Sequence, residues 1–283
     1  MPQNVLINLE ELSKPINTLI KKISNAAGIL YEPTRIKRKA LAKAEAKKTA
    51  ILTDIEVSDI QKRAMHRFLK EETIKQENIE SILEKSFDKI ENNATPDNIE
   101  DDWITHFFDK SKYISDENMQ ELWAKVLSGE SNAPHSYSKR TIECLSNLDK
   151  YDAELFTNFC KFIWNIGDLQ PLIFDYNNKI YNDYNINFSA LLHLDEIGLI
   201  NFNHDSGFSM FFDTDQIVES YFGKELHFQF NTPSNNRLNM GHTTLTKTGK
   251  ELALVVNASP IDDFYTYVIN YYSDQGITLT THI

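Results

Sequence analysis

The chain has 283 residues with an ordinary apolar content and many aromatic residues, namely 17 Phe, 12 Tyr and 3 Trp. This length suffices for two domains, or for one domain with an extended arm. The two cysteines, Cys144 and Cys160, make no CxxC pair, and they suggest a reducing compartment. No signal peptide and no long apolar run is recognisable, so we expect a cytoplasmic protein without a membrane-spanning helix.

Charge is distributed unevenly along the chain. Residues 1–50 carry ten Lys or Arg and four Glu, a net charge of +6, whereas the remainder has a net charge of −18. A basic arm on an acidic body suggests a polyanionic surface as a partner, or an arm that folds back on its own body.

The first predicted helix is amphipathic. Its apolar residues alternate steps of three and four, and we expect Ser13 to cap it with Pro15 in the first turn. This pattern fits an interfacial membrane helix, a partner-binding or self-associating helix, or an ordinary helix docked on the core. The predicted membrane or partner contacts are Leu12, Ile16, Leu19, Ile20, Ile23, Leu30, Lys21 and Lys22.

A second helical stretch begins at Pro33 and is rich in Ala, Lys and Arg. Its small apolar face predicts an exposed helix that a phosphate-rich surface could bind, either lipid headgroups or nucleic acid. A solvated arm is the alternative. The predicted polyanion contacts are Arg35, Lys37, Arg38, Lys39 and Lys43.

Residues 54–165 predict a helical core. One helix is expected to start with Thr95 as its cap and Pro96 at its first position. The next is expected to run from a Ser115 cap to a stop at Gly129. Further helices should open at Ser138 and Asp149.

Several strings in this core resemble the bacterial DUF2806 family of uncharacterised proteins, roughly over residues 30–160. The resemblance implies a fold family and a bacterial origin. It supplies no activity and no catalytic residues, and some related families are associated with anti-phage defence. The strings are YEPTRIKRKA, IEDDWITHFFDK, ISDENMQELWAKVLSGE and RTIECLSNLDKYDAELF.

The composition changes after about residue 165, where short β-like runs appear. The run NFSALLHLDEIGLI predicts a helix, and GLINF and GFSMFF around a polar turn predict a β-hairpin wing. The candidate recognition helix and wing carry His193, Asp195, Glu196, His204 and Asp205, a poor surface for phosphate. Protein contact is therefore expected over DNA contact.

Sequence motifs of common enzymes are missing, and the histidines are scattered. The nearest approach to a catalytic site is Asp101, Asp102 and His106, which suggests a metal-dependent hydrolase or nuclease. First-turn acids are also what a helix dipole favours. The run from His135 to Arg140 is a further polar cluster, best explained as a loop and helix cap.

We therefore predict an α+β, predominantly helical fold with three parts: a basic helical arm (1–53), a helical core (54–165) and a C-terminal winged-helix-like domain (166–283). The expected function is that of a self-associating, non-enzymatic protein without a cofactor. Its arm would contact a membrane surface or partner at the inner face of the membrane, and its C-terminal domain would sense a protein, in an anti-phage role. The alternatives are a winged-helix nucleic-acid-binding regulator and the metal-dependent hydrolase.

Overall fold

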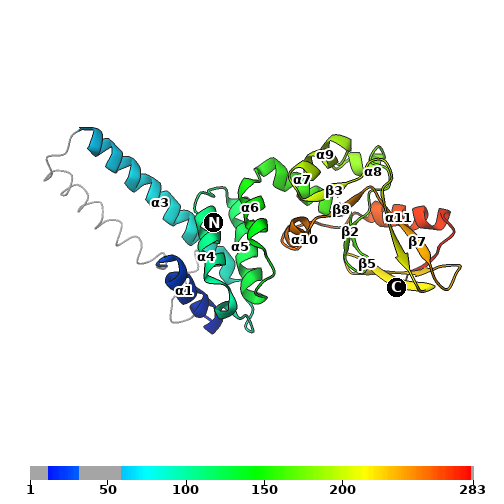
Figure 1. Ribbon diagram of the computed structural model, residues 1–283, viewed down its shortest axis with the longest axis horizontal. Coiled ribbons are helices and arrows are strands. Elements are labelled where there is room, and N and C mark those ends of the chain that lie inside the picture. Colours follow the sequence, from blue (N-terminus) through cyan, green and yellow to red (C-terminus); the bar gives the residue numbers. More distant parts are fainter. Residues whose placement is uncertain (1–11, 32–58, 282–283) are drawn as a thin grey trace. The chain divides into compact units, whose positions relative to one another are not determined.

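The computed structural model describes residues 12–31 and 59–281. The chain forms two compact units, Met1–Ser146 and Asn147–Ile283 (Figure 1). The fold is α+β and predominantly helical, as predicted. The boundary between the units precedes the helix at Lys150–Cys160, which the sequence had assigned to the helical core. That helix instead contacts the helix at Phe188–Glu196 of the second unit.

The first unit is built from helices. Its elements are α1 (Lys14–Ala27), α3 (Asp59–Phe87), the 3-10 helix η2 (Pro96–Asn98), α4 (Asp101–Ser111), α5 (Glu117–Asn132) and α6 (Lys139–Asn147). Within it, α3 packs on α5, and α1 packs on α4 and η2. Rings from α4 and α5 form the centre of this core: Phe107 stacks on Trp103 and meets Trp123 edge to face.

Three helix boundaries differ from the prediction. Thr95 and Pro96 open the short η2, and α4 begins separately at Asp101. The cap of α5 is Asp116, one residue after Ser115, because the Asp116 carboxylate accepts the N–H groups of the next turn. Gly129 does not stop α5, which continues to Asn132.

Close packing explains why position 129 is a glycine. A Cβ at this position would lie 2.7 Å from the ring of Tyr137, closer than carbon atoms can approach. The absence of a side chain therefore lets the loop after α5 pack directly on the helix. This requirement comes from a residue eight positions away, so the local pattern gave a wrong helix stop.

The second unit mixes helices and strands. Its helices are α7 (Lys150–Cys160), α8 (Lys179–Asn182), α9 (Phe188–Glu196), α10 (Lys247–Ala253) and α11 (Asp262–Asp274). Its strands are β1 (Ile163–Asn165), β2 (Leu169–Pro171), β3 (Ile200–Phe202), β4 (Phe208–Phe212), β5 (Gln216–Tyr221), β6 (Lys224–Gln229), β7 (Asn236–Gly241), β8 (Thr243–Leu245) and β9 (Thr278–Thr280).

Most strands of this unit form one antiparallel sheet in the order β2-β1-β5-β6-β9. Each neighbouring pair is antiparallel, and β5 and β6 are joined by a two-residue turn. Beside it, α11 buries Phe264, Val268 and Tyr272.

The prediction that β3 and β4 form a β-hairpin wing was wrong. These consecutive strands do not pair with each other: β3 pairs with β8, and β4 pairs with β7. The β5–β6 hairpin is inserted between β4 and β7. Sequence proximity suggested a simple hairpin, but the partners of β3 lie 41–45 residues later and those of β4 lie 24–33 residues later, so both pairings are long-range.

None of the helices in residues 12–31 and 59–281 has the length and hydropathy that crossing a membrane requires.

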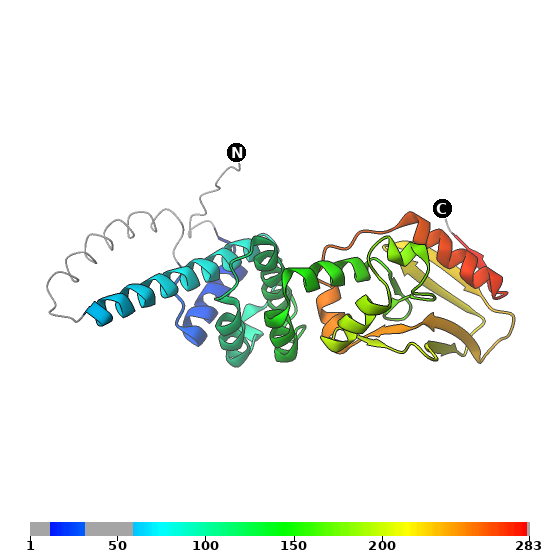
Figure 2. The ribbon, with the colours of Figure 1, turned by 90° about the horizontal axis from the view of Figure 1, so that it is seen from above.

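The first two-thirds of α3 extends away from the other helices of the first unit. Figures 1 and 2 both show α3 continuing well past α4 and α5. Its buried residues begin at Asn78, and the residues before it are exposed or half-buried.

Candidate functional site

The apolar face of α1 is buried within the first unit. Ile16, Leu19 and Ile23 are at most 8% exposed, and α1 contacts α4 and η2. The amine of Lys22 pairs with Asp101 at 2.7 Å. The helix is thus docked on the core, which was one of the three alternatives. The other predicted contacts are partly or fully exposed: Leu12, Ile20, Lys21 and Leu30.

The predicted polyanion contacts lie outside the described residues. They are Arg35, Lys37, Arg38, Lys39 and Lys43.

The predicted metal cluster does not come together. Asp101 pairs with Lys22, Asp102 lies 3.6 Å from the amine of Lys139, and His106 lies 3.0 Å from Glu143. Each acid of this cluster thus faces a cation from another helix. Across the part of the chain that the structure describes, no group of three or more His, Cys, Asp or Glu could hold a metal ion.

The cluster at His135 is held by a buried carboxylate. Glu130 is 1% exposed, and its two oxygens accept the backbone N–H groups of His135 and Tyr137 at 2.7 and 2.9 Å. Burial raises the pKa of Glu130, and these hydrogen bonds oppose the rise. A polar cavity of about 320 Å³ adjoins the loop. We assign Glu130 a structural role, because its hydrogen bonds fix the loop.

The candidate recognition helix α9 is also committed to internal contacts. His193 Nε2 lies 2.6 Å from the carboxylate of Asp152, and Asp195 accepts the N–H of Phe202 at 3.1 Å. Residues 147–283 contain 7 Lys or Arg and 17 Asp or Glu, a net charge of −10. An acidic unit repels nucleic-acid phosphates, so its surface chemistry suits a basic partner.

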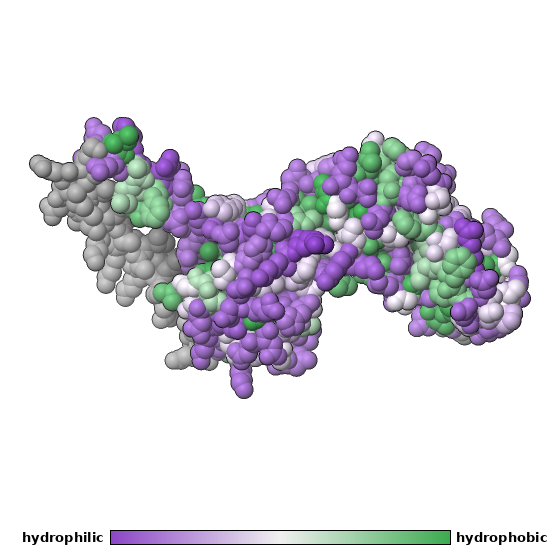
Figure 3. All heavy atoms as spheres, in the orientation of Figure 1, coloured by the Kyte–Doolittle hydropathy of each residue, from purple (hydrophilic) through white to green (hydrophobic). Residues whose placement is uncertain are grey.

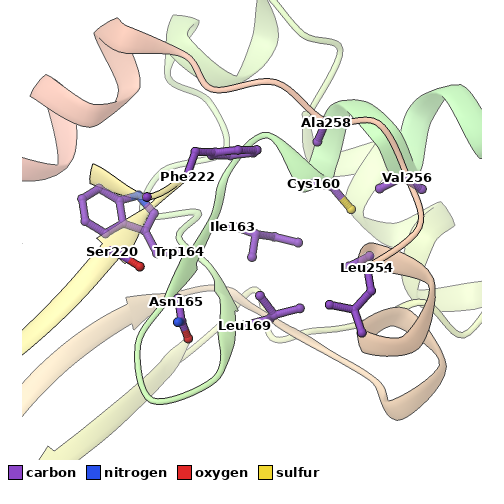
Figure 4. A pocket seen from close by; sticks show the side chains of 12 residues that line it. Cys160, Ile163, Trp164, Asn165, Leu169, Ser220, Phe222, Leu254, Val256 and Ala258 are labelled. Atoms are coloured by element: carbon purple, nitrogen blue, oxygen red, sulfur yellow. The ribbon is translucent and has the colours of Figure 1, made fainter. Parts of the chain in front are cut away.

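The second unit contains an apolar cavity of about 270 Å³ (Figure 4). Its walls come from the end of α7, the β1–β2 hairpin, the turn between β5 and β6 and the segment after α10. In Figure 4 the side chains of Ile163, Leu169 and Leu254 lie together, and Phe222 extends above Ile163. The lining residues are Cys160, Ile163, Trp164, Asn165, Leu169, Ser220, Phe222, Gly223, Ala253, Leu254, Val256 and Ala258.

Two large apolar side chains at this cavity are exposed to solvent. Leu254, just past the end of α10, is 67% exposed, and Phe222 is 44% exposed. Apolar side chains of this size usually gain about 1.5–3 kcal/mol from full burial. Their exposure around an apolar hollow is typical of a surface that binds another molecule.

The backbone at Phe222 is strained. Phe222 and Gly223 form the two-residue turn between β5 and β6, with φ of 47° and 82°. Asn or Asp followed by Gly is the preferred pair for a turn with two positive φ values, whereas a bulky residue there is unusual. The turn thus holds an aromatic ring at the cavity at a conformational cost. Such outliers cluster at functional sites.

Trp164 lies at one end of the cavity. Its indole is 0% exposed and stacks on the rings of Tyr221 and Tyr265, with centroids 5.2 and 5.5 Å away. The indole Nε1–H has no hydrogen-bond partner among the described residues. A buried donor without an acceptor costs about 1–3 kcal/mol. The indole of Trp164 therefore leaves one buried donor unpaired beside the apolar cavity.

Sequence reasoning missed this site. Its residues come from four segments of the chain, and the long-range pairing of β1 with β5 brings the β1–β2 hairpin to the turn between β5 and β6. One local signal was available: Phe222-Gly223 stands where an Asn-Gly pair would be expected between two strands. Cys160, at the end of α7, is 3% exposed, and burial raises the pKa of its thiol well above the usual range.

A family model described as "Protein of unknown function (DUF2806)" matches residues 62–269. The match therefore leaves out YEPTRIKRKA and extends far beyond residue 160, into the second unit and across all of the cavity-lining residues. No curated protein and no solved structure matches the chain.

Proposed function

The chain belongs to the DUF2806 family, whose description assigns no activity, and we propose that it is a non-enzymatic, self-associating binding protein. In this proposal its second unit binds a segment of a protein partner in the cavity beside Phe222 and Leu254. The bound segment carries one large apolar side chain flanked by lysines or arginines. The observation that carries the proposal is the strained, exposed Phe222 at an apolar cavity.

The chemistry of the cavity defines the apolar part of the partner. At about 270 Å³ it lies just below the range of cavities that hold drug-sized ligands, so a single side chain suits it better than a cofactor. Interfaces commonly gain most of their affinity from one such anchor in a desolvated pocket.

The charge of the unit defines the flanks of the segment. A net charge of −10 over residues 147–283 attracts basic residues and repels acidic ones. The exposed carboxylates of Asp168 and Asp262 lie on segments near the cavity walls, and each is paired with a lysine of this unit. Electrostatic attraction thus contributes association rate and selectivity, and the apolar anchor contributes affinity.

Membrane contact by α1 was predicted from the sequence, and it is not part of the function proposed here. The apolar face of the helix is buried against α4 and η2, so the helix would have to detach before it could insert into a lipid surface. No described contact favours that release.

The experiment is fluorescence anisotropy with the full chain and two labelled peptides. One peptide has a phenylalanine between lysines, and the other has alanine in its place. We expect the phenylalanine peptide to bind at least about fivefold tighter, which corresponds to roughly 1 kcal/mol for the anchor. Equal affinities would contradict the proposal, because binding would then be purely electrostatic.

The matched variants are Leu254→Glu and Phe211→Glu. Both replace an exposed apolar side chain and add the same charge, but Phe211 is on β4 and does not line the cavity. A purely electrostatic interaction would strengthen in both. We expect Leu254→Glu to remove the preference for phenylalanine and Phe211→Glu to retain it.

A further inference from the structure

The cavity beside the His135 loop belongs to the first unit and is lined mainly by polar side chains. Its volume of about 320 Å³ is at the lower end of the range for ligand cavities, which suits a molecule of amino-acid size. It lies where the start of α4, the end of α5 and the start of α6 meet. In Figure 3, hydrophilic residues cover most of the visible surface over these helices. The lining residues are Glu100, Trp103, Glu130, His135, Tyr137, Ser138 and Lys139.

The buried carboxylate of Glu130 fixes the wall of this cavity. Its hydrogen bonds hold the loop in which His135 has a φ of 73°, a left-handed conformation that is uncommon for residues other than glycine. The same loop is tied to α4, because the Nε1–H of Trp103 donates to the carbonyl oxygen of Tyr137 at 2.7 Å. The wall is thus a constrained loop, so the cavity is formed before any ligand binds.

Two exposed charges of opposite sign line the cavity without neutralising each other. In the described part of the chain, the carboxylate of Glu100 has no ion-pair or hydrogen-bond partner. The amine of Lys139 lies 3.6 Å from Asp102, whose side chain is 88% exposed, so this pair contributes little. By contrast, Asp101 and His106 of the same helix α4 both pair with side chains of other helices. A carboxylate and an amine are therefore available to a molecule in the cavity.

From these two charges we propose that the cavity binds a small zwitterion of the α-amino acid class. The ammonium group of the ligand pairs with Glu100, and its carboxylate pairs with Lys139. A molecule with only one charge would be attracted by one of these side chains and repelled by the other. Trp103 and Tyr137 border the space for the ligand's side chain. This site lies in the first unit, so it goes beyond the peptide binding proposed for the second unit.

Binding can be followed by ¹⁹F NMR of the full chain labelled with 5-fluorotryptophan, because Trp103 lines the cavity. Each standard amino acid is titrated, and Trp103→Phe assigns the signal. We expect at least one of them to shift the Trp103 signal with a Kd of about 1 mM or tighter and to leave the Trp164 signal unchanged. If none binds, or if only the Trp164 signal moves, the proposal is overturned.

Two probes then test whether both charges of the ligand are needed. They have the side chain of the tightest-binding amino acid, but one is the amine without the carboxylate and the other is the acid without the ammonium group. We expect each of them to bind about tenfold more weakly than the amino acid. An amine or acid that binds as tightly as the amino acid would show that the site does not recognise a zwitterion.

Matched variants test the two lining charges separately. Glu100→Gln should weaken the amino acid and its amine about tenfold and strengthen the acid, and Lys139→Gln should weaken the amino acid and the acid and strengthen the amine. Both positions are exposed, so these changes leave the fold intact, and circular dichroism checks that. Glu117→Gln, at an exposed position of α5 that does not line the cavity, should bind like the wild type. Identical effects of the two cavity variants on all three probes, or no effect on any, would contradict the assigned pairing.

Discussion

The amine of Lys22 lies 2.7 Å from the Oδ1 atom of Asp101. The sequence assigned Lys22 to a membrane or partner surface and Asp101 to a candidate metal cluster. In the structure they are partners of each other and join α1 to α4. Two apparent functional signals thus become one contact that helps to dock the first helix.

Docking of α1 should depend on its apolar side chains more than on this ion pair. We expect Leu19→Ala, at a 0% exposed position, to lower the free energy of unfolding by about 3 kcal/mol. Lys22→Ala should lower it by less than about 1 kcal/mol, because Asp101 is largely exposed. Urea unfolding measures both. A stability unchanged by Leu19→Ala would mean that α1 is not docked in solution.

Phe222→Asn should separate stability from binding. Asn-Gly is the favoured pair for this turn, and a non-glycine residue at positive φ costs about 1–2 kcal/mol. We expect the variant to be as stable as the wild type or more stable, by up to about 1 kcal/mol, and to lose the phenylalanine-peptide preference.

Phe222→Ala is the control for this turn. It removes the ring but keeps a Cβ that is disfavoured at a φ of 47°. Thermal unfolding should therefore rank the asparagine variant above the alanine variant. The reverse ranking would show that the positive φ at position 222 does not limit the stability of the fold.

The contribution of Glu130 to the free energy of unfolding should decrease as the pH rises through the acid range. Its pKa is raised above the ordinary 4.5, so the folded state holds the proton more tightly than the unfolded state. Its contribution is therefore complete below pH 4.5 and is lost as pH rises through the folded pKa. The stability of the wild type minus that of Glu130→Gln should decrease across this interval.

The control for this titration is Glu117→Gln, at the exposed start of the same helix. Because a glutamine side chain accepts hydrogen bonds with one oxygen only, Glu130→Gln loses stability at every pH, and the pH-dependent part alone reports the titration. A difference curve that is flat or rising would contradict the assigned direction of the pKa shift.

Gly129→Ala should destabilise the first unit. Alanine improves helix propensity by about 1 kcal/mol, but its Cβ would lie 2.7 Å from the Tyr137 ring, and overpacking costs about 1–3 kcal/mol. A double-mutant cycle with Tyr137→Ala should give a clear coupling between the two positions. A simple gain in stability from Gly129→Ala would show that the ring moves freely.

Local signals predicted the helices of this protein well. The helix start at Asp149 depends on residues within a few positions of each other, and the structure confirms it. The wing was wrong because β3 pairs with a strand 41–45 residues later and β4 with one 24–33 residues later. The family resemblance was also confirmed, over a range that extends farther towards the C-terminus.

The candidate site was much harder to predict than the fold. The membrane and metal sites were inferred from side chains of suitable type, but Leu19 and Asp101 turn out to make internal contacts. The cavity at Trp164 depends on long-range strand pairing, which periodicity does not report. Phe222 was visible as an unusual turn residue, yet its meaning depends on the cavity beside it.

The central claim is that a partner's apolar side chain enters the cavity beside Trp164. The most direct measurement is ¹⁹F NMR of the full chain with 5-fluorotryptophan at its three Trp positions, with Trp164→Phe to assign the signals. We predict that the phenylalanine peptide shifts the Trp164 signal saturably and leaves Trp103 and Trp123 unchanged. An unmoved Trp164 signal at saturating peptide, or an equal shift with the alanine peptide, would contradict the claim.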